Sequence, residues 1–236
     1  MADYNPAEAS ATRNHTADPP ELPRPTHAGV PGPNDITQLI LDDHEWFRRA
    51  FARLDELQAT KVPSVDLLRV WTPLAGRLDA HAVAEEEIFY PQLLRKGADA
   101  REETLDAIGD HNDIRDGVHD AGRRAVGSDG WWEAVGRARA ANDEHMAEEE
   151  REGLADFRLH ATIGLREALG RRFRAFMAEH GDAHDLDTSD KDPQEYVDTE
   201  GGTSNGHTSN GTEPATTPDT TTRADHSLGI GSLKGR

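Results

Sequence analysis

The sequence predicts an all-α fold: an up-down-up-down four-helix bundle with an additional C-terminal helix and disordered tails. Three observations lead to this prediction. Apolar residues recur at steps of three and four over five segments, no segment shows the alternation of a strand, and the connections between segments are short. The bundle is expected to occupy residues 34–181, the usual size of one compact helical domain.

The first helix is expected to begin near the capping candidates Asn34 and Asp35 and to end near Ala59. Its apolar residues follow the period of a helix that buries one face. They are Ile36, Ile40, Phe47, Phe51 and Leu54. His44 lies within this stripe, so its side chain is expected to point into the bundle.

The second helix is expected to start at residues 63–64, where proline is followed by serine, and to stop at Pro91. Pro73 lies within the pattern and is expected to kink the helix or to mark its true beginning. His81 and Glu85 continue the apolar stripe, so both are expected to face the interior.

Three further helices are expected after the second. The third spans roughly residues 99–125, the fourth follows a glycine-containing break at residues 127–130, and the fifth spans about residues 162–180. Gly181 is a plausible residue just past the end of the fifth helix. The fifth helix is expected to pack on the outside of the bundle or at one of its ends.

Both ends of the chain have the composition of disordered segments. Residues 1–33 contain seven prolines and few large apolar side chains. Residues 182–236 form an acidic tail rich in Gly, Ser, Thr, Asp and Pro, in which burial is not expected to offset the loss of conformational entropy. The tail closes on an apolar, basic-ended segment at residues 228–236, which is a candidate docking peptide for a protein partner.

Composition excludes several classes of function. The formal net charge of −19 argues against nucleic-acid binding, because an acidic chain repels phosphate. The absence of Cys rules out disulfides and zinc–thiolate sites. The N-terminus lacks the apolar region of a signal peptide and no stretch is long enough to span a membrane, so a cytoplasmic protein is expected.

One arrangement of metal-ligand residue types occurs twice. In each copy a lone His is followed, 37 or 34 residues later, by a His with a Glu four positions on. The copies are His44, His81 and Glu85, and His111, His145 and Glu149. Because residues i and i+4 share one face of a helix, each His–Glu pair can grip a single ion. Two such hairpins facing each other would form a dinuclear metal site.

Simpler explanations exist for each part of this pattern. A lone buried His is usually a core residue bonded to a neighbour, and in the runs Glu85–Glu87 and Glu148–Glu150 two of the three carboxylates are expected on solvated faces. The joint occurrence favours metal, because unpaired buried ligands are costly. The Glu-x-x-His of ferritin-like bundles and the His-Glu-x-x-His of zincins are absent. The other histidines, among them His119, His160 and His180, are expected at the surface or around the site.

These motifs resemble those of the hemerythrin family, specifically the hemerythrin-like proteins with a His-His-Glu (HHE) cation-binding domain, over residues 35–180. The resemblance implies that Glu85 and Glu149 bridge two irons. It also implies that each iron has its own pair of histidines, His44 with His81 and His111 with His145.

Two departures from the oxygen-carrying members bear on function. Position 115 is Arg, where those proteins have a second third-helix His. The last motif offers Glu149 at +4 and Glu150 at +5, where they have Asp at +5. Arg115 is expected to point toward the site and to pair with a nearby carboxylate. One ligand fewer favours reaction with small oxidants over reversible oxygen carriage.

We therefore expect a non-haem di-iron protein that binds or reduces O2, peroxide or NO, with two Fe ions and with Mn or Zn as possible occupants. The alternative is a non-enzymatic iron or oxygen sensor, or an iron-binding module, that signals through the C-terminal tail. The sequence assigns no catalytic residue and leaves open whether the protein is an enzyme.

Overall fold

The computed structural model describes residues 32–202, and this part of the chain is helical with no strand. Its elements, in chain order, are α1 (Ile36–Thr60), α2 (Ser64–Ala84), the π-helical turn η1 (Glu85–Phe89), α3 (Tyr90–Lys96), α4 (Ala100–Gly122), α5 (Asp129–Arg151), α6 (Gly153–His160), α7 (Ile163–His180) and α8 (Pro193–Gly201).

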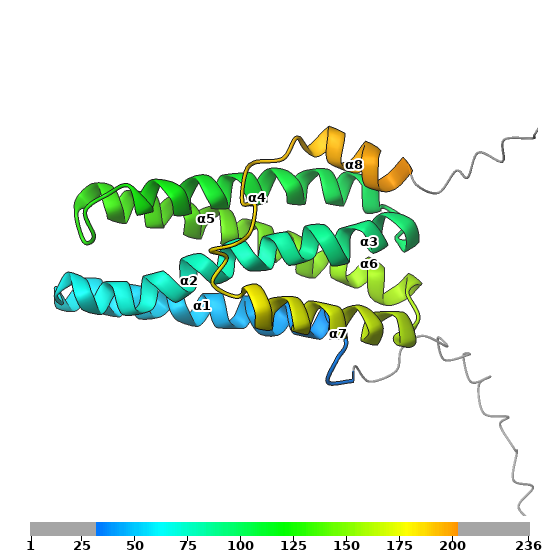
Figure 1. The fold of residues 1–236 in the computed structure, drawn as a ribbon, viewed down its shortest axis with the longest axis horizontal. Helices are drawn as coiled ribbons and strands as arrows, with labels where there is room; N and C mark the ends of the chain where they lie inside the picture. The colour runs from blue at the N-terminus through cyan, green and yellow to red at the C-terminus, as the bar shows by residue number, and fades with distance from the viewer. Residues whose placement is uncertain (1–31, 203–236) are drawn as a thin grey trace, which may run out of the picture. The chain divides into compact units, whose positions relative to one another are not determined.

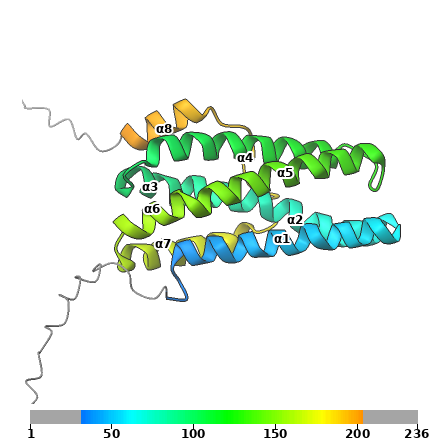
Figure 2. The same cartoon turned by 180° about the vertical axis from the view of Figure 1, so that it is seen from behind.

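The predicted four-helix bundle is present. Helices α1 and α2 form one hairpin and α4 and α5 form the other, with α3 and α6 extending the second and fourth helices (Figure 1; Figure 2). The predicted fifth helix, α7, packs along α1 and α2 on the outside of the bundle. No helix in residues 32–202 has the length and apolar content needed to cross a membrane.

Side-chain caps fix the starts of three helices at the predicted places. Asp35 accepts a hydrogen bond from Thr37 N at the start of α1, Ser128 caps α5 and Thr162 caps α7. Each cap satisfies a backbone N–H that the helix itself leaves without a partner. These starts set the register that brings the apolar stripe of each helix to the interior.

The apolar core consists of two clusters placed one after the other along the bundle. On α1, Ile40 belongs to the first cluster and Phe47 to the second. On α4, Ile108 and Ile114 are divided in the same way. The buried histidines of these two helices lie in the gaps, so polar residues interrupt the core midway along the bundle.

The prediction that the second helix ends at Pro91 is wrong, because the helix continues to Lys96. The π-helical turn explains this. Tyr90 N–H donates to Glu85 O, five residues back, so the hydrogen-bond register has already shifted when the chain reaches Pro91. Pro91 then occupies the first turn of α3, where a missing N–H is tolerated. Pro73 lies inside α2, so it does not mark the helix start.

The expectation of a disordered tail from residue 182 is wrong for residues 182–202. Helix α8 is capped by Asp192 and packs on α4 and α3, with Val197 fully buried. A helix of 9 residues with one buried apolar side chain shows no periodicity that the sequence could reveal. Residues 1–31 and 203–236, with the candidate docking segment 228–236, lie outside the described residues.

Candidate metal centre

The six residues singled out as metal ligands are all buried at the interruption of the core, and they come from both hairpins. Their positions are His44 on α1, His81 on α2, Glu85 at the start of η1, His111 on α4, and His145 and Glu149 on α5. Long-range packing thus brings the two sequence copies to one place.

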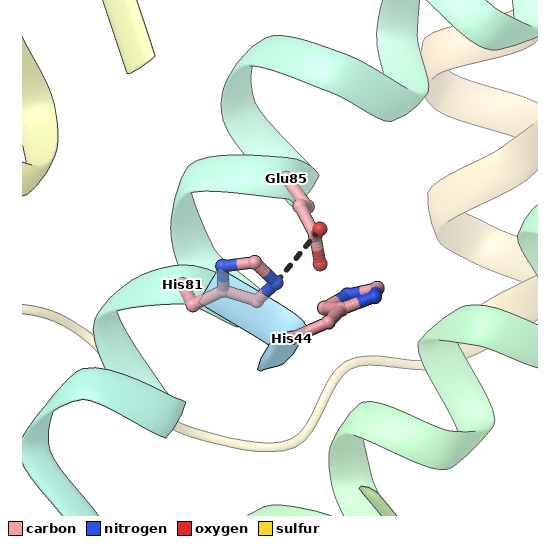
Figure 3. A group of neighbouring side chains, drawn as sticks. All are labelled: His44, His81 and Glu85. Carbon is pink, nitrogen blue, oxygen red and sulfur yellow. Dashed lines mark ion pairs between the residues drawn. The ribbon is translucent and has the colours of Figure 1, made fainter. Parts of the chain in front are cut away.

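The first group of ligand types is His44, His81 and Glu85, whose ligand atoms lie within 4.8 Å of one another. Figure 3 shows the two rings and the carboxylate turned toward a common point. His81 Nε2 lies 2.9 Å from Glu85 Oε1, the i,i+4 pair expected from the sequence. This group can hold one cation with two imidazoles and one carboxylate.

The second group is Glu85, His111 and His145, again within 4.8 Å of one another. His111 Nε2 lies 3.3 Å from Glu85 Oε2 and 3.2 Å from His145 Nε2. Glu85 belongs to both groups and turns its Oε1 to His81 and its Oε2 to His111. This carboxylate is therefore placed to bridge two cations.

Glu149 lies beside the first group without belonging to either set of three. Its Oε2 is 3.3 Å from His44 Nε2, and its Oε1 accepts a hydrogen bond of 3.1 Å from the hydroxyl of Tyr90. Tyr90 is fully buried and was not singled out by the sequence, because a tyrosine on an apolar stripe is most often a core residue.

Several buried atoms at this point face one another at 2.9–3.3 Å but make no well-formed hydrogen bond among the described residues. They are His44 Nε2, His81 Nε2, both carboxylate oxygens of Glu85, and Glu149 Oε2. Leaving a buried polar group without a hydrogen bond costs on the order of 1–3 kcal/mol. A cation would satisfy all of these atoms together, so the residues present fit a metal centre.

Each of the four candidate ligand histidines has a carboxylate next to its Nδ1, on the side away from the centre. This leaves its Nε2 facing the centre. The four Nδ1–carboxylate distances are 2.9 Å for His44 and Glu150, 3.1 Å for His81 and Asp43, 2.9 Å for His111 and Glu86, and 3.5 Å for His145 and Asp110. Such partners fix the tautomer and orientation of a ligand imidazole and raise its basicity.

The outer carboxylates follow the same repeat as the ligands. Asp43 and Asp110 each precede the lone His of a copy and contact the other His of that copy. Glu86 and Glu150 each follow the ligand Glu and contact the lone His of the opposite copy. Their equal offsets in the two copies were the sequence feature that could have revealed them.

The expectation that two carboxylates of each run lie on solvated faces is correct for Glu87, which is exposed, and wrong for Glu86, which is buried; Glu148 and Glu150 are half-buried. Glu86 is 2% exposed, and His111, Arg115 and Lys191 all contact its carboxylate. Its pKa would be raised by burial, but the hydrogen bond to His111 and the charges of Arg115 and Lys191 lower it to about 2.

An arginine four residues after each lone His supports an outer glutamate. Arg48 Nη2 donates to Glu150 Oε1 at 2.8 Å, and Arg115 Nη2 donates to Glu86 Oε1 at 2.7 Å. The expectation that Arg115 pairs with a carboxylate near the site is confirmed. Arg115 belongs to neither ligand group; it contacts Glu86, which in turn contacts the ligand candidate His111.

The metal-free centre holds protons on two of its histidines at neutral pH. Burial alone would lower the pKa of His81, but Glu85 and Asp43 raise it to about 10. In the same way, Asp110, Glu85 and Glu149 raise the pKa of His145 to about 10. Burial would raise the pKa of Glu85, but the neighbouring histidines hold it well below its usual value. Each ligand group therefore contains one imidazolium whose proton a metal ion must displace.

The remaining described histidines lie apart from the two ligand groups. His119 is partly exposed with Asp79 at 3.9 Å, His160 pairs with Asp156, and His180 pairs with Asp185. A further cluster of ligand types, Asp182, His184 and Asp185, is exposed at the surface. The prediction that His119, His160 and His180 lie outside the site holds for the structure.

A small cavity of about 20 Å³ adjoins the centre between α4 and α5. Tyr90, His145 and Glu149 line its inner side, and Glu103 and Asp110 are among the acidic residues around it. A space of this size holds about one water-sized molecule.

Comparison with known proteins identifies one family. The family model described as "Hemerythrin HHE cation binding domain" matches residues 35–155, a span that contains both ligand groups. No curated protein and no solved structure matches the chain.

Proposed function

The chain belongs to the hemerythrin HHE cation-binding domain family, and on this premise we propose that it is a non-haem di-iron protein that binds or reduces a small oxidant such as O2, peroxide or NO. The observation that carries the proposal is the pair of ligand groups that share Glu85, each with two imidazoles and one carboxylate.

The donor set favours iron. Two histidines and one carboxylate with open positions are typical of non-haem Fe(II) sites that react with oxygen. Mn and Zn accept the same donors and are the alternatives. When bound, iron supplies electron transfer to a small oxidant, and the protein supplies ligands, orientation and a site shielded from bulk water.

The cavity beside the centre supports a ligand of two or three atoms. Its volume of about 20 Å³ has room for a water-sized molecule, and Tyr90, His145 and Glu149 line it. The Tyr90 hydroxyl now donates to Glu149, and a small rotation would let it donate to a molecule in the cavity. Burial and the neighbouring carboxylates raise the pKa of Tyr90 well above its usual value, so it keeps its proton at neutral pH.

A second candidate function is a non-enzymatic iron or oxygen sensor that acts through the C-terminal segment. One observation favours it: Lys191 and Tyr196, which follow the bundle in the chain, both contact Glu86 beside His111. A change at the metal centre could in this way reach the C-terminal part of the chain.

Metal analysis with optical spectroscopy tests both functions. Protein loaded with iron is expected to contain about two ions per chain and to show the near-ultraviolet absorption of an oxo-bridged diferric centre. Turnover of peroxide or NO would favour the enzyme, and iron-dependent protection of the C-terminal segment without turnover would favour the sensor. The control is His119→Ala, which should keep the wild-type iron content. Iron content near zero in the reconstituted wild type would refute the proposal.

A further inference from the structure

The segment that follows α7 contacts Glu86 at its side-chain carboxylate and at its backbone oxygen. Lys191 Nζ donates to the carboxylate at Oε2, and the Tyr196 hydroxyl donates to the backbone oxygen, each at 2.5 Å. The same carboxylate bonds Nδ1 of His111 through its Oε1. Residues 191–201, which we call the strap, thus reach a ligand histidine through one intermediate residue.

The contact to the backbone of Glu86 fills a position that the helix itself leaves open. Tyr90 N–H donates to Glu85 O, and residue 91 is a proline without an N–H. The two donors that an α-helix or a π-helix would supply to Glu86 O are therefore missing. Tyr196 provides the replacement, so this irregular turn of η1 is completed by the strap.

The strap is held in place by contacts independent of Glu86. Asn112 on α4 makes two hydrogen bonds to the backbone of Lys191, of 2.8 and 3.0 Å. Val197 is fully buried, and Arg101 on α4 pairs with Asp198 at 2.6 Å. The strap therefore has a defined register on α4, and that register sets where Lys191 and Tyr196 meet Glu86.

The opposite half of the centre lacks such an element. Glu150 supports His44 and receives a hydrogen bond from Arg48, the counterpart of Arg115. Its side chain is 29% exposed, whereas that of Glu86 is fully covered. Within residues 32–202, no lysine and no tyrosine donates to Glu150. The strap thus breaks the two-fold symmetry of the centre on the side of His111.

We propose that the strap positions His111 through Glu86, and that Lys191 and Tyr196 are positioning residues for the second ligand group. This inference rests on the proposed metal centre. Without these two contacts, Glu86 keeps its bond to Arg115 but loses the restraint on its outer oxygen and on its backbone. The ring of His111 would then be held less firmly, and the group of Glu85, His111 and His145 would bind its ion more weakly.

Cobalt titration of the metal-free full-length chain tests this proposal, because the visible bands of Co²⁺ report ligand geometry at each site. The variants are Lys191→Met, which removes the charge and keeps most of the stem, and Tyr196→Phe, which removes one hydroxyl. Lys191→Arg restores a cation, and the control Lys96→Met makes the same change at an exposed position.

We expect Lys191→Met and Tyr196→Phe to weaken one of the two Co²⁺ binding steps by about tenfold, the lower end of the range for residues that support metal ligands. The other step should change less, and Lys191→Arg should recover most of the loss. In the metal-free protein, the same two variants should shift the ring nitrogen resonances of His111 and leave those of His44 in place.

The possible outcomes separate this inference from the function it rests on. If the wild-type chain takes up neither cobalt nor iron, the proposed metal centre itself is refuted. A wild type that binds two ions, with variants identical to it at both steps, would overturn the role of the strap alone. Equal weakening of both steps would also overturn it, since this would indicate general loss of structure. If Lys191→Met does not fold, the near-isosteric Tyr196→Phe still decides the question.

Discussion

Metal binding by this protein is expected to release protons, and the dependence on pH can be worked out from the site. His81 and His145 both have pKa values raised to about 10 in the metal-free chain. One of them belongs to each ligand group. Because only a neutral imidazole can ligate, each ion displaces one proton from a histidine as it binds.

The size of the effect follows from the distance between the pKa and the working pH. At pH 7, removing a proton from a group with a pKa of about 10 costs roughly 4 kcal/mol, at 1.36 kcal/mol per unit. The apparent affinity for each ion should therefore rise about tenfold per pH unit, or roughly thirtyfold between pH 7.0 and 8.5. Histidines with an ordinary pKa of about 6.5 would give a nearly flat response over the same interval.

The assay is a Co²⁺ titration at pH 7.0, 7.5, 8.0 and 8.5, with calorimetry in two buffers of different ionisation enthalpy to count the released protons. About one proton per ion is expected from the histidines. His119→Ala should give the same slope, because His119 lies outside both ligand groups. An affinity that stays constant over this range would show that His81 and His145 are neutral before the metal arrives.

Three further predictions address single residues. His145→Ala should lower the iron content of the reconstituted chain by about one ion, measured by metal analysis, because only the second ligand group contains it; an unchanged content would remove it from the ligand set. Arg115→Met should lower the free energy of unfolding by about 3–5 kcal/mol, since Arg115 is fully buried on Glu86, whereas the exposed Arg48→Met should cost about 1 kcal/mol or less in the same urea titration. Equal losses would contradict this. Glu86, with a pKa lowered to about 2, stabilises the metal-free fold fully above its unfolded value of 4.5 and less as the pH falls toward 2. The free energy of unfolding in urea should therefore fall less between pH 5 and pH 3 in Glu86→Gln than in the wild type. Identical losses would show that the pKa of Glu86 is not lowered in the folded chain.

The helices and the inward position of the ligand residues could be predicted from the sequence. The stripe that contains His44 and the i,i+4 spacing of His81 and Glu85 are local properties, because the period of a helix decides which residues share a face. The caps at Asp35, Ser128 and Thr162 are local as well, since each bonds a backbone N–H within three residues.

The helix that passes Pro91 could not be predicted in the same way. Proline normally ends a helix, and the sequence offers no sign of the π-helical turn that shifts the register just before it. The burial of Glu86 was misjudged for another reason, because it involves Arg115 and Lys191, which reach this residue only in the folded chain.

Contacts between helices were decided only by the tertiary structure. Asp43 holds His81 rather than its neighbour His44, and Glu86 holds His111 from the other hairpin. The sequence shows that these carboxylates recur at fixed offsets, but the partner of each depends on how the helices rotate and stack.

The strap is the clearest case of a feature that only the tertiary structure decided. Residues 191–201 have too few apolar side chains for the sequence to predict a packed helix, and their burial depends on a surface formed by α4 and α3. The sequence alone predicted which residues could serve as metal ligands, because ligand type and helical spacing are local. The tertiary structure decided which groups orient those ligands, because carboxylates, arginines and the strap meet them only after the helices have packed.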